Sequence, residues 1–323
     1  MRLTIIGHNT HMANDSGRIL PVAAFVALAL IWGASFLLIK VGVSAMSPAT
    51  LVLVRTLSGA LALVLVLTLF RPSAWRQLRK HLGASLVMAL VGTVLPFVAI
   101  SWGEIYIASG LASILNATIP LWTGLLALWV APAERPTGLN FVGIAIGLGG
   151  VAILVGPQLL SHGLSWGPLG ALAVVGAAFS YAAAALFQRR HLASMDPIAA
   201  SLAQLLLATL LVLPLAVPGL PSARLSGLPL LCVLALGIGG TGLAYVLYYY
   251  LLNSMGAARA TTVTYLIPVT AVAWGALLLG EPIGPPILAG MAVVLLGVLL
   301  ATRRRRPVPI PAPVPAGVQG DRT

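Results

Sequence analysis

The sequence is poor in charged residues. Only 7% of its 323 residues are Asp, Glu, Lys or Arg, whereas a soluble domain carries about 25%. Apolar types make up 59% of the chain, so a folded form could not cover itself with polar side chains in water. This excludes an ordinary soluble domain. A lipid bilayer suits the same composition, and the chain is therefore predicted to be an integral membrane protein.

Cysteine and histidine are also scarce. Cys232 is the only cysteine and lies in an apolar run, which excludes an internal disulfide and a CxxC metal site. The five histidines lie in predicted tails or at the ends of apolar runs: His8, His11, His81, His162 and His191. No catalytic Ser/His/Asp set and no metal-ligand set converges within the runs. The sequence therefore predicts no enzyme activity, no metal and no cofactor.

Nucleotide-binding patterns are absent or misplaced. The chain has no P-loop, which argues against a primary pump. The stretch GIGGTG, residues 237–242, matches a dinucleotide-binding pattern, but that site needs a preceding strand and an acidic residue about 20 positions later. Here the flanks are apolar and the next acidic residue is Glu281. We interpret the stretch as a thin, close-packed or hinge-like helical segment.

What the chain does contain is ten long apolar runs. A helix needs about 20 mostly apolar residues to cross the hydrocarbon core, where an open strand would leave its backbone unpaired. The runs lie near residues 19–41, 48–70, 82–103, 107–131, 138–156, 168–188, 197–217, 227–252, 257–280 and 284–302. We therefore predict an all-α integral membrane protein with ten transmembrane helices.

Basic residues gather on one side of the predicted bundle. With a cytoplasmic N-terminus, the clearly outside segments hold Arg224 alone, and Lys40 lies near an outer helix end. The Arg303–Arg306 run is interpreted as an anchor against anionic lipid rather than a nucleic-acid patch. We expect both termini in the cytoplasm, in tails formed by residues 1–18 and 303–323. The excess of arginine over lysine indicates a bacterial cytoplasmic (inner) membrane.

The two halves of the chain share a pattern. Several positions recur at an offset of 148 or 149 residues: Pro120 with Pro268, Asn116 with Thr264, and Arg55 with Gln204. The halves, residues 19–157 and 168–302, contain five runs each. An odd number of crossings inverts the second half, and inverted repeats are a recurring plan of secondary transporters, with the substrate near the membrane midplane.

Polar residues precede the two repeated prolines at helical spacing. The triplets are Ser113, Asn116 and Pro120 in the first half and Thr261, Thr264 and Pro268 in the second. Each proline removes the hydrogen bond to the carbonyl group four residues earlier, at Asn116 or Thr264. Lipid offers these groups no partner, so they either line a cavity or form hydrogen bonds between helices. The cavity and the interhelical hydrogen bonds both stay open as interpretations.

Three stretches that contain these motifs resemble a known family: "LIWGASFLLIKVG", "ISWGEIYIASGLASILNATIPLWTGLLA" and "YLLNSMGAARATTVTYLIPVTAVAWGALLLGEPIGPPILAGMAVVLLGVLLA". They resemble the two EamA-type repeats of the drug/metabolite transporter superfamily, and the resemblance covers most of the chain. It implies ten helices, both termini in the cytoplasm, and export or exchange of small metabolites such as amino acids. The chain departs from the family pattern where Ala133-Glu134 replaces Gly-Glu and where Tyr181-Ala182 stands opposite Trp32-Gly33.

Polar, charged and aromatic residues within the runs complete the predicted site. Arg55 is an intramembrane charge, which costs about 2.5–3.5 kcal/mol on insertion scales and therefore marks a functional or paired structural role. Its nearest predicted charges are Lys40 and Glu104, and an Arg–Glu clamp is the structural alternative. The candidate substrate-binding residues are Trp32, Arg55, Ser113, Asn116, Tyr181, Gln204, Thr261, Thr264 and Tyr265.

Three acidic residues receive separate interpretations. Glu104 is the only carboxylate inside an apolar run or at its end. Because leaving water favours the neutral carboxyl and a nearby cation opposes this, Glu104 is the candidate for proton coupling. Glu134 and Glu281, which open short loops, are expected to cap or pair locally.

The predicted function is a secondary transporter that moves, and by resemblance exports, a small metabolite by alternating access around a midplane cavity. The expected partners are a small-molecule substrate, the lipid bilayer and protons, with no nucleic acid. A passive channel or facilitator is the main alternative. A membrane-embedded enzyme is a weaker one, because the histidines lie outside the predicted core.

Overall fold

The chain folds into a bundle of α-helices. The computed structural model describes residues 12–130 and 135–303, and these ranges contain no strand. Within them, eight segments are long and apolar enough to cross a membrane: Ile19–Val43, Pro48–Phe70, Leu82–Tyr106, Ser109–Val130, Gly138–Ser161, Trp166–His191, Pro197–Ser222 and Gly227–Met255. Two further apolar helices, Val263–Leu279 and Pro285–Ala301, are shorter, at 17 residues each. This agrees with the predicted all-helical membrane class.

Some of these segments are single helices and others are interrupted. The single helices are α1 (Met12–Val43), α2 (Pro48–Phe70), α7 (Gly138–His162), α8 (Trp166–His191), α9 (Pro197–Ala216) and α14 (Pro285–Ala301). A π-helix, η2 (Leu90–Val94), joins α3 (Leu82–Ala89) to α4 (Leu95–Tyr106), and another, η5 (Ile238–Leu243), joins α10 (Gly227–Gly237) to α11 (Ala244–Met255). Two turns separate α5 (Ser109–Asn116) from α6 (Ile119–Val130) and α12 (Ala257–Ala260) from α13 (Val263–Leu279). Short 3-10 helices are η1 (Pro72–Gln77) and η4 (Val217–Ser222).

Caps and prolines fix where several helices begin. The Ser47 hydroxyl accepts a hydrogen bond from the Thr50 amide, just ahead of Pro48 at the start of α2. At the start of α9, the Asp196 carboxylate accepts hydrogen bonds from two backbone amides in the first turn. Proline suits the first turn because the N–H that it lacks would have no partner inside the helix. These sequence signals therefore position the two helices that carry Arg55 and Gln204.

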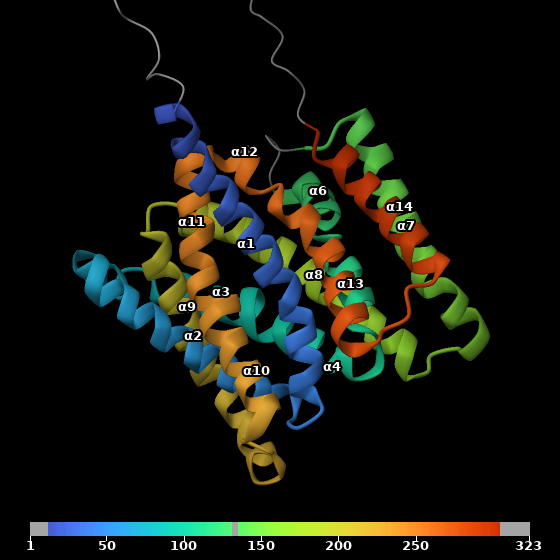
Figure 1. The fold of residues 1–323 in the computed structure, drawn as a ribbon, viewed down its shortest axis with the longest axis horizontal. Helices are drawn as coiled ribbons and strands as arrows, with labels where there is room; N and C mark the ends of the chain where they lie inside the picture. The colour runs from blue at the N-terminus through green and yellow to red at the C-terminus, as the bar shows by residue number, and fades with distance from the viewer. Residues whose placement is uncertain (1–11, 131–134, 304–323) are drawn as a thin grey trace, which may run out of the picture.

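Both ends of the described chain lie on one side of the bundle. Figure 1 shows the start of α1 and the end of α14 at the top, near α12, while α10 lies toward the bottom. We call the side of the bundle on which both chain ends lie the terminal side. The backbone of α1 is helical from Met12, so residues 12–18, expected in a tail, extend the first helix. The remaining parts of the predicted tails, residues 1–11 and 304–323, lie outside the described residues.

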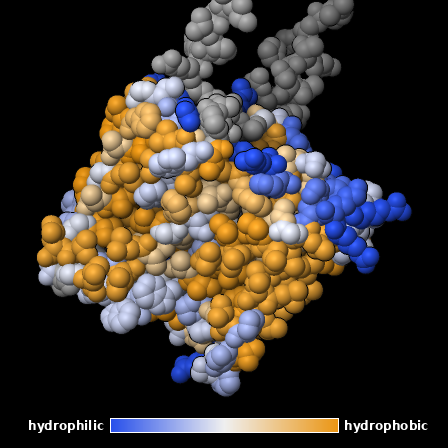
Figure 2. All heavy atoms as spheres, turned by 180° about the vertical axis from the view of Figure 1, so that it is seen from behind, coloured by the Kyte–Doolittle hydropathy of each residue, from blue (hydrophilic) through white to orange (hydrophobic). Residues whose placement is uncertain are grey.

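Apolar side chains cover the outside of the bundle. On α2, for example, Leu57, Leu61, Leu65 and Leu69 are exposed at every fourth position. Figure 2 shows apolar residues across the middle of one face, while polar residues gather mainly toward the side of the termini. An exposed apolar surface of this extent marks contact with lipid or with another protein.

Glycines allow the last helices of the two halves to touch. A methyl group on Gly143 of α7 would overlap the backbone of Gly297 and Ala301 in α14. A methyl group on Gly297 would in turn overlap the backbone of Gly147. Glycine at these positions therefore leaves room for backbone-to-backbone contact between α7 and α14. Small residues permit such contacts in membranes because the backbones can then approach closely.

Candidate functional site

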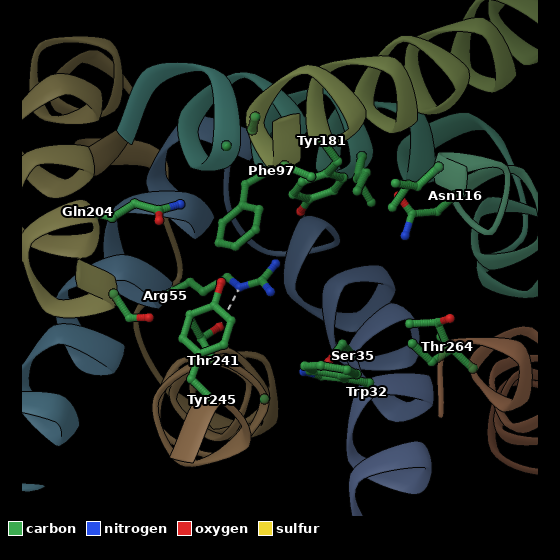
Figure 3. A pocket seen from close by; sticks show the side chains of 18 of the residues that line it. Trp32, Ser35, Arg55, Phe97, Asn116, Tyr181, Gln204, Thr241, Tyr245 and Thr264 are labelled. Atoms are coloured by element: carbon green, nitrogen blue, oxygen red, sulfur yellow. Dashed lines mark hydrogen bonds between the residues drawn. The ribbon is translucent and has the colours of Figure 1, made fainter. Parts of the chain in front are cut away.

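A cavity of about 360 Å³ lies inside the bundle, between helices of the two halves (Figure 3). Six of the nine predicted binding residues line it: Trp32, Arg55, Asn116, Tyr181, Gln204 and Thr264. The rest of the wall is formed by Ser35, Phe36, Ile39, Met88, Gly92, Phe97, Ile100, Ile119, Ala184, Ala185, Gln188, Ser201, Gly240, Thr241, Tyr245, Tyr249 and Ile267. The lining therefore combines aromatic and apolar side chains with a few polar groups, as is usual for small-molecule sites.

Arg55 supplies the one charged side chain of this lining. It is only 8% exposed, and its Nε donates a 3.0 Å hydrogen bond to Thr241 Oγ1 in the π-helix η5. Its guanidinium carbon lies 3.6 Å from the centre of the Phe97 ring, a cation–π contact. Among the described residues no carboxylate forms an ion pair with Arg55, since the one such bridge there joins Arg71 to Asp196 at 3.3 Å. The alternative of an Arg55–Glu104 clamp is therefore wrong for this structure.

Gln204 on α9 makes the matching contact in the other half. Its Nε2 donates a 2.6 Å hydrogen bond to Thr93 Oγ1, in the π-helix η2. Thr93 and Thr241 are 148 residues apart, the offset that also relates Asn116 to Thr264. Arg55 and Gln204 thus each contact a threonine in a π-helix of the opposite half.

The same offsets relate most of the cavity wall. Eighteen of the 23 lining residues form nine pairs when one offset is used for each part of the chain. At 149 residues the pairs are 32 with 181, 35 with 184, 36 with 185, 39 with 188, and 55 with 204, and at 148 residues they are 92 with 240, 97 with 245, 116 with 264, and 119 with 267. Corresponding positions of the two halves therefore face one space.

Asn116 lies at a break between two helices. Helix α5 ends at Asn116, and α6 begins at Ile119 with Pro120 in its first turn. The side-chain oxygen Oδ1 of Asn116 is buried and has no hydrogen-bond partner. A buried acceptor without a partner is costly, so this atom is available to a donor that enters the cavity. Figure 3 shows Asn116 away from Gln204, with the Arg55 guanidinium between them.

The second half places its polar group differently. The chain turns at Thr261 and Thr262, and Pro268 lies inside the continuous helix α13. The hydroxyl of Thr264 lines the cavity and donates to the backbone oxygen of Thr261 at 2.8 Å. The proline spacing recurs, but the helix break does not occur at the corresponding place.

Three predicted binding residues lie outside the cavity wall. Ser113 is buried, and its hydroxyl donates to the backbone oxygen of Gly110 at 2.7 Å. Thr261 is an exposed turn residue, and the Tyr265 hydroxyl pairs with Thr302 Oγ1 at 2.7 Å. The expectation that Ser113 and Thr261 share a cavity-facing surface with Asn116 and Thr264 does not hold. Thr261 lies in the turn before α13 and so leaves the face of Thr264, whereas Ser113 lies on α5 with Asn116 but turns its hydroxyl to the backbone.

Two contacts join helices on the side opposite the termini. The Lys40 amino group donates to the backbone oxygens of Glu104 and Ile107, the latter at 2.9 Å, which ties α1 to the end of α4. The Glu281 carboxylate accepts from Ser109 N at 2.7 Å, Ser109 Oγ at 3.0 Å and Gly110 N at 3.1 Å. Glu281 therefore caps a helix, as expected, but the helix that it caps begins 172 residues earlier in the sequence, so the contact is not local. Glu134 lies outside the described residues.

Glu104, whose backbone oxygen accepts from Lys40, has a fully buried side chain. Both of its carboxylate oxygens lack a hydrogen-bond partner, and it does not line the cavity. It lies one helical turn beyond Ile100, which does line the cavity. A buried acid without a partner favours its neutral form over a charged one. Glu104 therefore stays the proposed proton-coupling residue.

Sequence reasoning missed the two π-helices and their threonines. The GIGGTG stretch forms most of η5 and the end of α10, and three of its four glycines, Gly237, Gly240 and Gly242, pack against α1 or α2. A methyl group on Gly242, for example, would lie 2.9 Å from the Ala62 side chain and 3.1 Å from Gly59 O. The interpretation of a close-packed segment is thus confirmed. The usable signal was the recurrence of Gly-Thr at residues 92–93 and 240–241, at the offset already seen elsewhere.

Comparisons with known proteins agree with this architecture. A model of the EamA-like transporter family matches residues 19–156 and again residues 168–303. The chain is 30% identical over 296 residues to the uncharacterised inner membrane transporter YedA of Escherichia coli K12, covering 88% of this chain and 92% of that protein. It is 26% identical over 279 residues to the uncharacterised transporter YoaV of Bacillus subtilis, covering 86% of this chain and 94% of the other.

Two further similarities concern a named exporter and a solved structure. The chain is 28% identical over 288 residues to a probable terminal-alkyne amino-acid exporter of Streptantibioticus cattleyicolor, covering 88% of this chain and 93% of that protein. A crystal structure aligns with a TM-score of 0.63 at 20% sequence identity and covers 88% of this chain and 98% of the other. At that identity the likeness concerns the fold alone.

Proposed function

The chain belongs to the EamA-like transporter family of the drug/metabolite transporter superfamily, and we propose from this premise that it is a secondary transporter. It carries a small metabolite such as an amino acid, in the direction of export, by alternating access around the cavity in Figure 3. The observation that carries the proposal is the nine pairs of corresponding residues that line this one cavity. Inverted-repeat transporters place the substrate between their halves in this way.

The proposed membrane topology has ten crossings and two inverted halves, at 19–157 and 168–302. In support of it, eight long spans are followed by two 17-residue apolar helices, and α1 begins on the side where α14 ends. The excess of basic residues on that side favours a cytoplasmic location for both termini, in a bacterial inner membrane.

Cysteine labelling in intact cells tests this topology, in a Cys232→Ser background. Ser73→Cys and Ser194→Cys should be shielded from an impermeant thiol reagent, because their loops lie on the proposed cytoplasmic side. Ser165→Cys and Ser222→Cys should be labelled. All four positions are exposed in the structure, so shielding cannot be attributed to burial. The reverse pattern would overturn the orientation, and labelling of all four would overturn the inverted topology.

We propose that the described conformation is the state that is closed on the side opposite the termini. If each span crosses the membrane once, the end of α8, the start of α9 and the end of α11 lie on the terminal side. The cavity residues Gln188, Ser201 and Tyr249 lie toward these helix ends. The Lys40 and Glu281 contacts close the other side. Alternating access would break these contacts and close the terminal side instead.

Substitution of the paired polar residues tests the cavity as the substrate site. Asn116→Ala and Thr264→Ala should each weaken the apparent substrate affinity several-fold, because one uncharged hydrogen bond contributes about 0.5–1.5 kcal/mol. Thr123→Ala is the matched control, since its hydroxyl bonds within α6 and does not line the cavity. Concentration-dependent uptake by proteoliposomes gives the affinity. Wild-type affinity in both cavity variants would contradict the proposed site.

Glu104 is proposed to couple transport to protons. A carboxyl group that is buried here and hydrated in the alternate state can take up and release a proton, and Arg55 or Lys40 would supply the charge that resets it. The isosteric Glu104→Gln protein should still exchange substrate across the bilayer but lose its response to an imposed pH gradient. Gradient-driven accumulation equal to that of the wild type, by a well-expressed variant, would exclude this role.

A further inference from the structure

The cavity contains a single positive charge and no acidic residue among its lining residues. Arg55 uses Nε to bind Thr241, and one face of its guanidinium group is covered by the Phe97 ring. Its two terminal nitrogens have no hydrogen-bond partner among the described residues. Figure 3 shows these nitrogens pointing into the middle of the cavity. The protein thus holds a fixed cation at the place where a substrate would bind.

A buried cation without an ion-pair partner is stabilised by an anion that binds beside it. The remaining two nitrogens of a guanidinium group form a planar fork that fits a carboxylate with two parallel hydrogen bonds. One guanidinium group neutralises one negative charge, and a second charge on the ligand would be buried without a partner at high cost. The chemistry of the site therefore fits a monocarboxylate better than a phosphate ester or a dicarboxylate.

The surroundings of Arg55 also disfavour an ammonium group. An α-ammonium lies next to the carboxylate, and here it would approach the guanidinium charge with no acidic side chain in the lining to balance it. The unpaired Asn116 Oδ1 lies apart from the guanidinium in Figure 3, so it suits a donor at the far end of the ligand rather than an α-ammonium. The aromatic rings of Trp32, Phe97 and Tyr181 instead offer apolar contact. At about 360 Å³ the cavity is near the lower end of the usual range for ligand sites, which favours a small ligand.

We propose that the preferred substrates are small monocarboxylate anions with an apolar or aromatic body, held through the carboxylate by Arg55, ahead of zwitterionic amino acids. This inference rests on the proposed transport function and moves its preferred substrate class from amino acids to monocarboxylates. Gln204 occupies the corresponding position in the second half and carries no charge, so the pseudosymmetric site binds the anion at one end only.

A series of ligands with one shared body tests the charge preference. Binding of hydrocinnamate, hydrocinnamamide, phenylalanine and phenethylamine to the purified full-length protein is measured by isothermal titration. The anion should bind roughly ten- to hundredfold more tightly than the amide or the zwitterion. The reason is that hydrogen bonds between two charged groups contribute more free energy than those to a neutral group, and the difference corresponds to this ratio of binding constants. Equal binding of all four, tightest binding of phenylalanine or phenethylamine, or no binding of hydrocinnamate would each overturn the inference.

Variants assign the preference to Arg55. Arg55→Gln should lose roughly ten- to hundredfold in affinity for hydrocinnamate and change little for the amide. Adding Gln204→Arg should restore much of the anion preference from the corresponding position, and Arg71→Gln, outside the cavity, should behave as wild type. A folded Arg55→Gln protein with wild-type anion preference would overturn the assignment. If the Arg55→Gln protein does not fold, the protein with both Arg55→Gln and Gln204→Arg and the ligand series on the wild-type protein still test the inference.

Uptake into proteoliposomes separates this inference from the proposed function. If hydrocinnamate binds through Arg55 but is never carried across the bilayer, the anion site stands and the transport proposal fails. If the protein carries phenylalanine or phenethylamine in preference to hydrocinnamate, transport stands and the monocarboxylate inference fails.

Discussion

The Glu281→Ala variant should open the cavity toward the side opposite the termini. The Glu281 carboxylate accepts three hydrogen bonds from Ser109 and Gly110, and it joins the loop after α13 to the start of α5. A hydrogen bond to a charged group contributes about 1.5–3 kcal/mol, and a negative charge at a helix N-terminus adds to this. Since about 1.4 kcal/mol changes an equilibrium constant tenfold, the population that is open on this side should rise by more than tenfold.

A cysteine in the cavity measures this opening. In a Cys232→Ser background, Ser35→Cys should react more than tenfold faster with an impermeant reagent added on the side opposite the termini when Glu281 is also replaced by Ala. Asp196→Ala is the control, because Asp196 caps α9 and pairs with Arg71 on the terminal side and makes no contact on the side that Glu281 holds. Unchanged reactivity of Ser35→Cys in a folded Glu281→Ala protein would show that the contact does not hold this side closed.

The Gly143→Ala substitution should strongly destabilise the protein. The added methyl group would overlap backbone atoms of Gly297 and Ala301, which cannot move without shifting α14. Overpacking of this kind costs about 1–3 kcal/mol. The expected result is a clear fall in the melting temperature of the purified protein, with reduced yield in the membrane.

Gly149→Ala is the matched control on the same helix. A methyl group there meets no heavy atom within 4 Å, and alanine forms helix more readily than glycine. Its melting temperature should stay unchanged or rise. Equal losses in the two variants would mean that the close approach of α7 and α14 does not explain the requirement for glycine at 143.

The class of fold and much of the cavity wall could be predicted from the sequence. Apolar runs gave the approximate helix bounds because each run must satisfy its own backbone in lipid. The offset of 148 or 149 residues paired Arg55 with Gln204 and Asn116 with Thr264. All four residues line one cavity, because corresponding positions of the two halves face each other. Local spacing alone was a poorer guide, as Ser113 and Thr261 show.

Features that depend on distant partners could not be predicted. Glu281 has the sequence context of a loop residue, and nothing local indicates that Ser109, 172 residues earlier, supplies its partners. Lys40 has the sequence context of a charge at a helix end, and nothing local indicates that it binds backbone oxygens at the end of α4. In the π-helices the backbone hydrogen bonds span five residues instead of four, as when the Leu95 amide donates to Leu90 O and the Ala244 amide donates to Gly239 O. That choice follows from packing against α2, which the sequence of one helix does not record.

The central claim is that a single cavity, lined by corresponding residues of both halves, carries substrate by alternating access. Counterflow in proteoliposomes that contain the purified protein tests it most directly. Vesicles loaded with unlabelled substrate should transiently accumulate labelled substrate above its outside concentration, with a rate that saturates, because a loaded carrier returns only by exchanging its ligand. A flux that rises linearly with concentration and shows no transient accumulation would contradict the account and identify a passive channel.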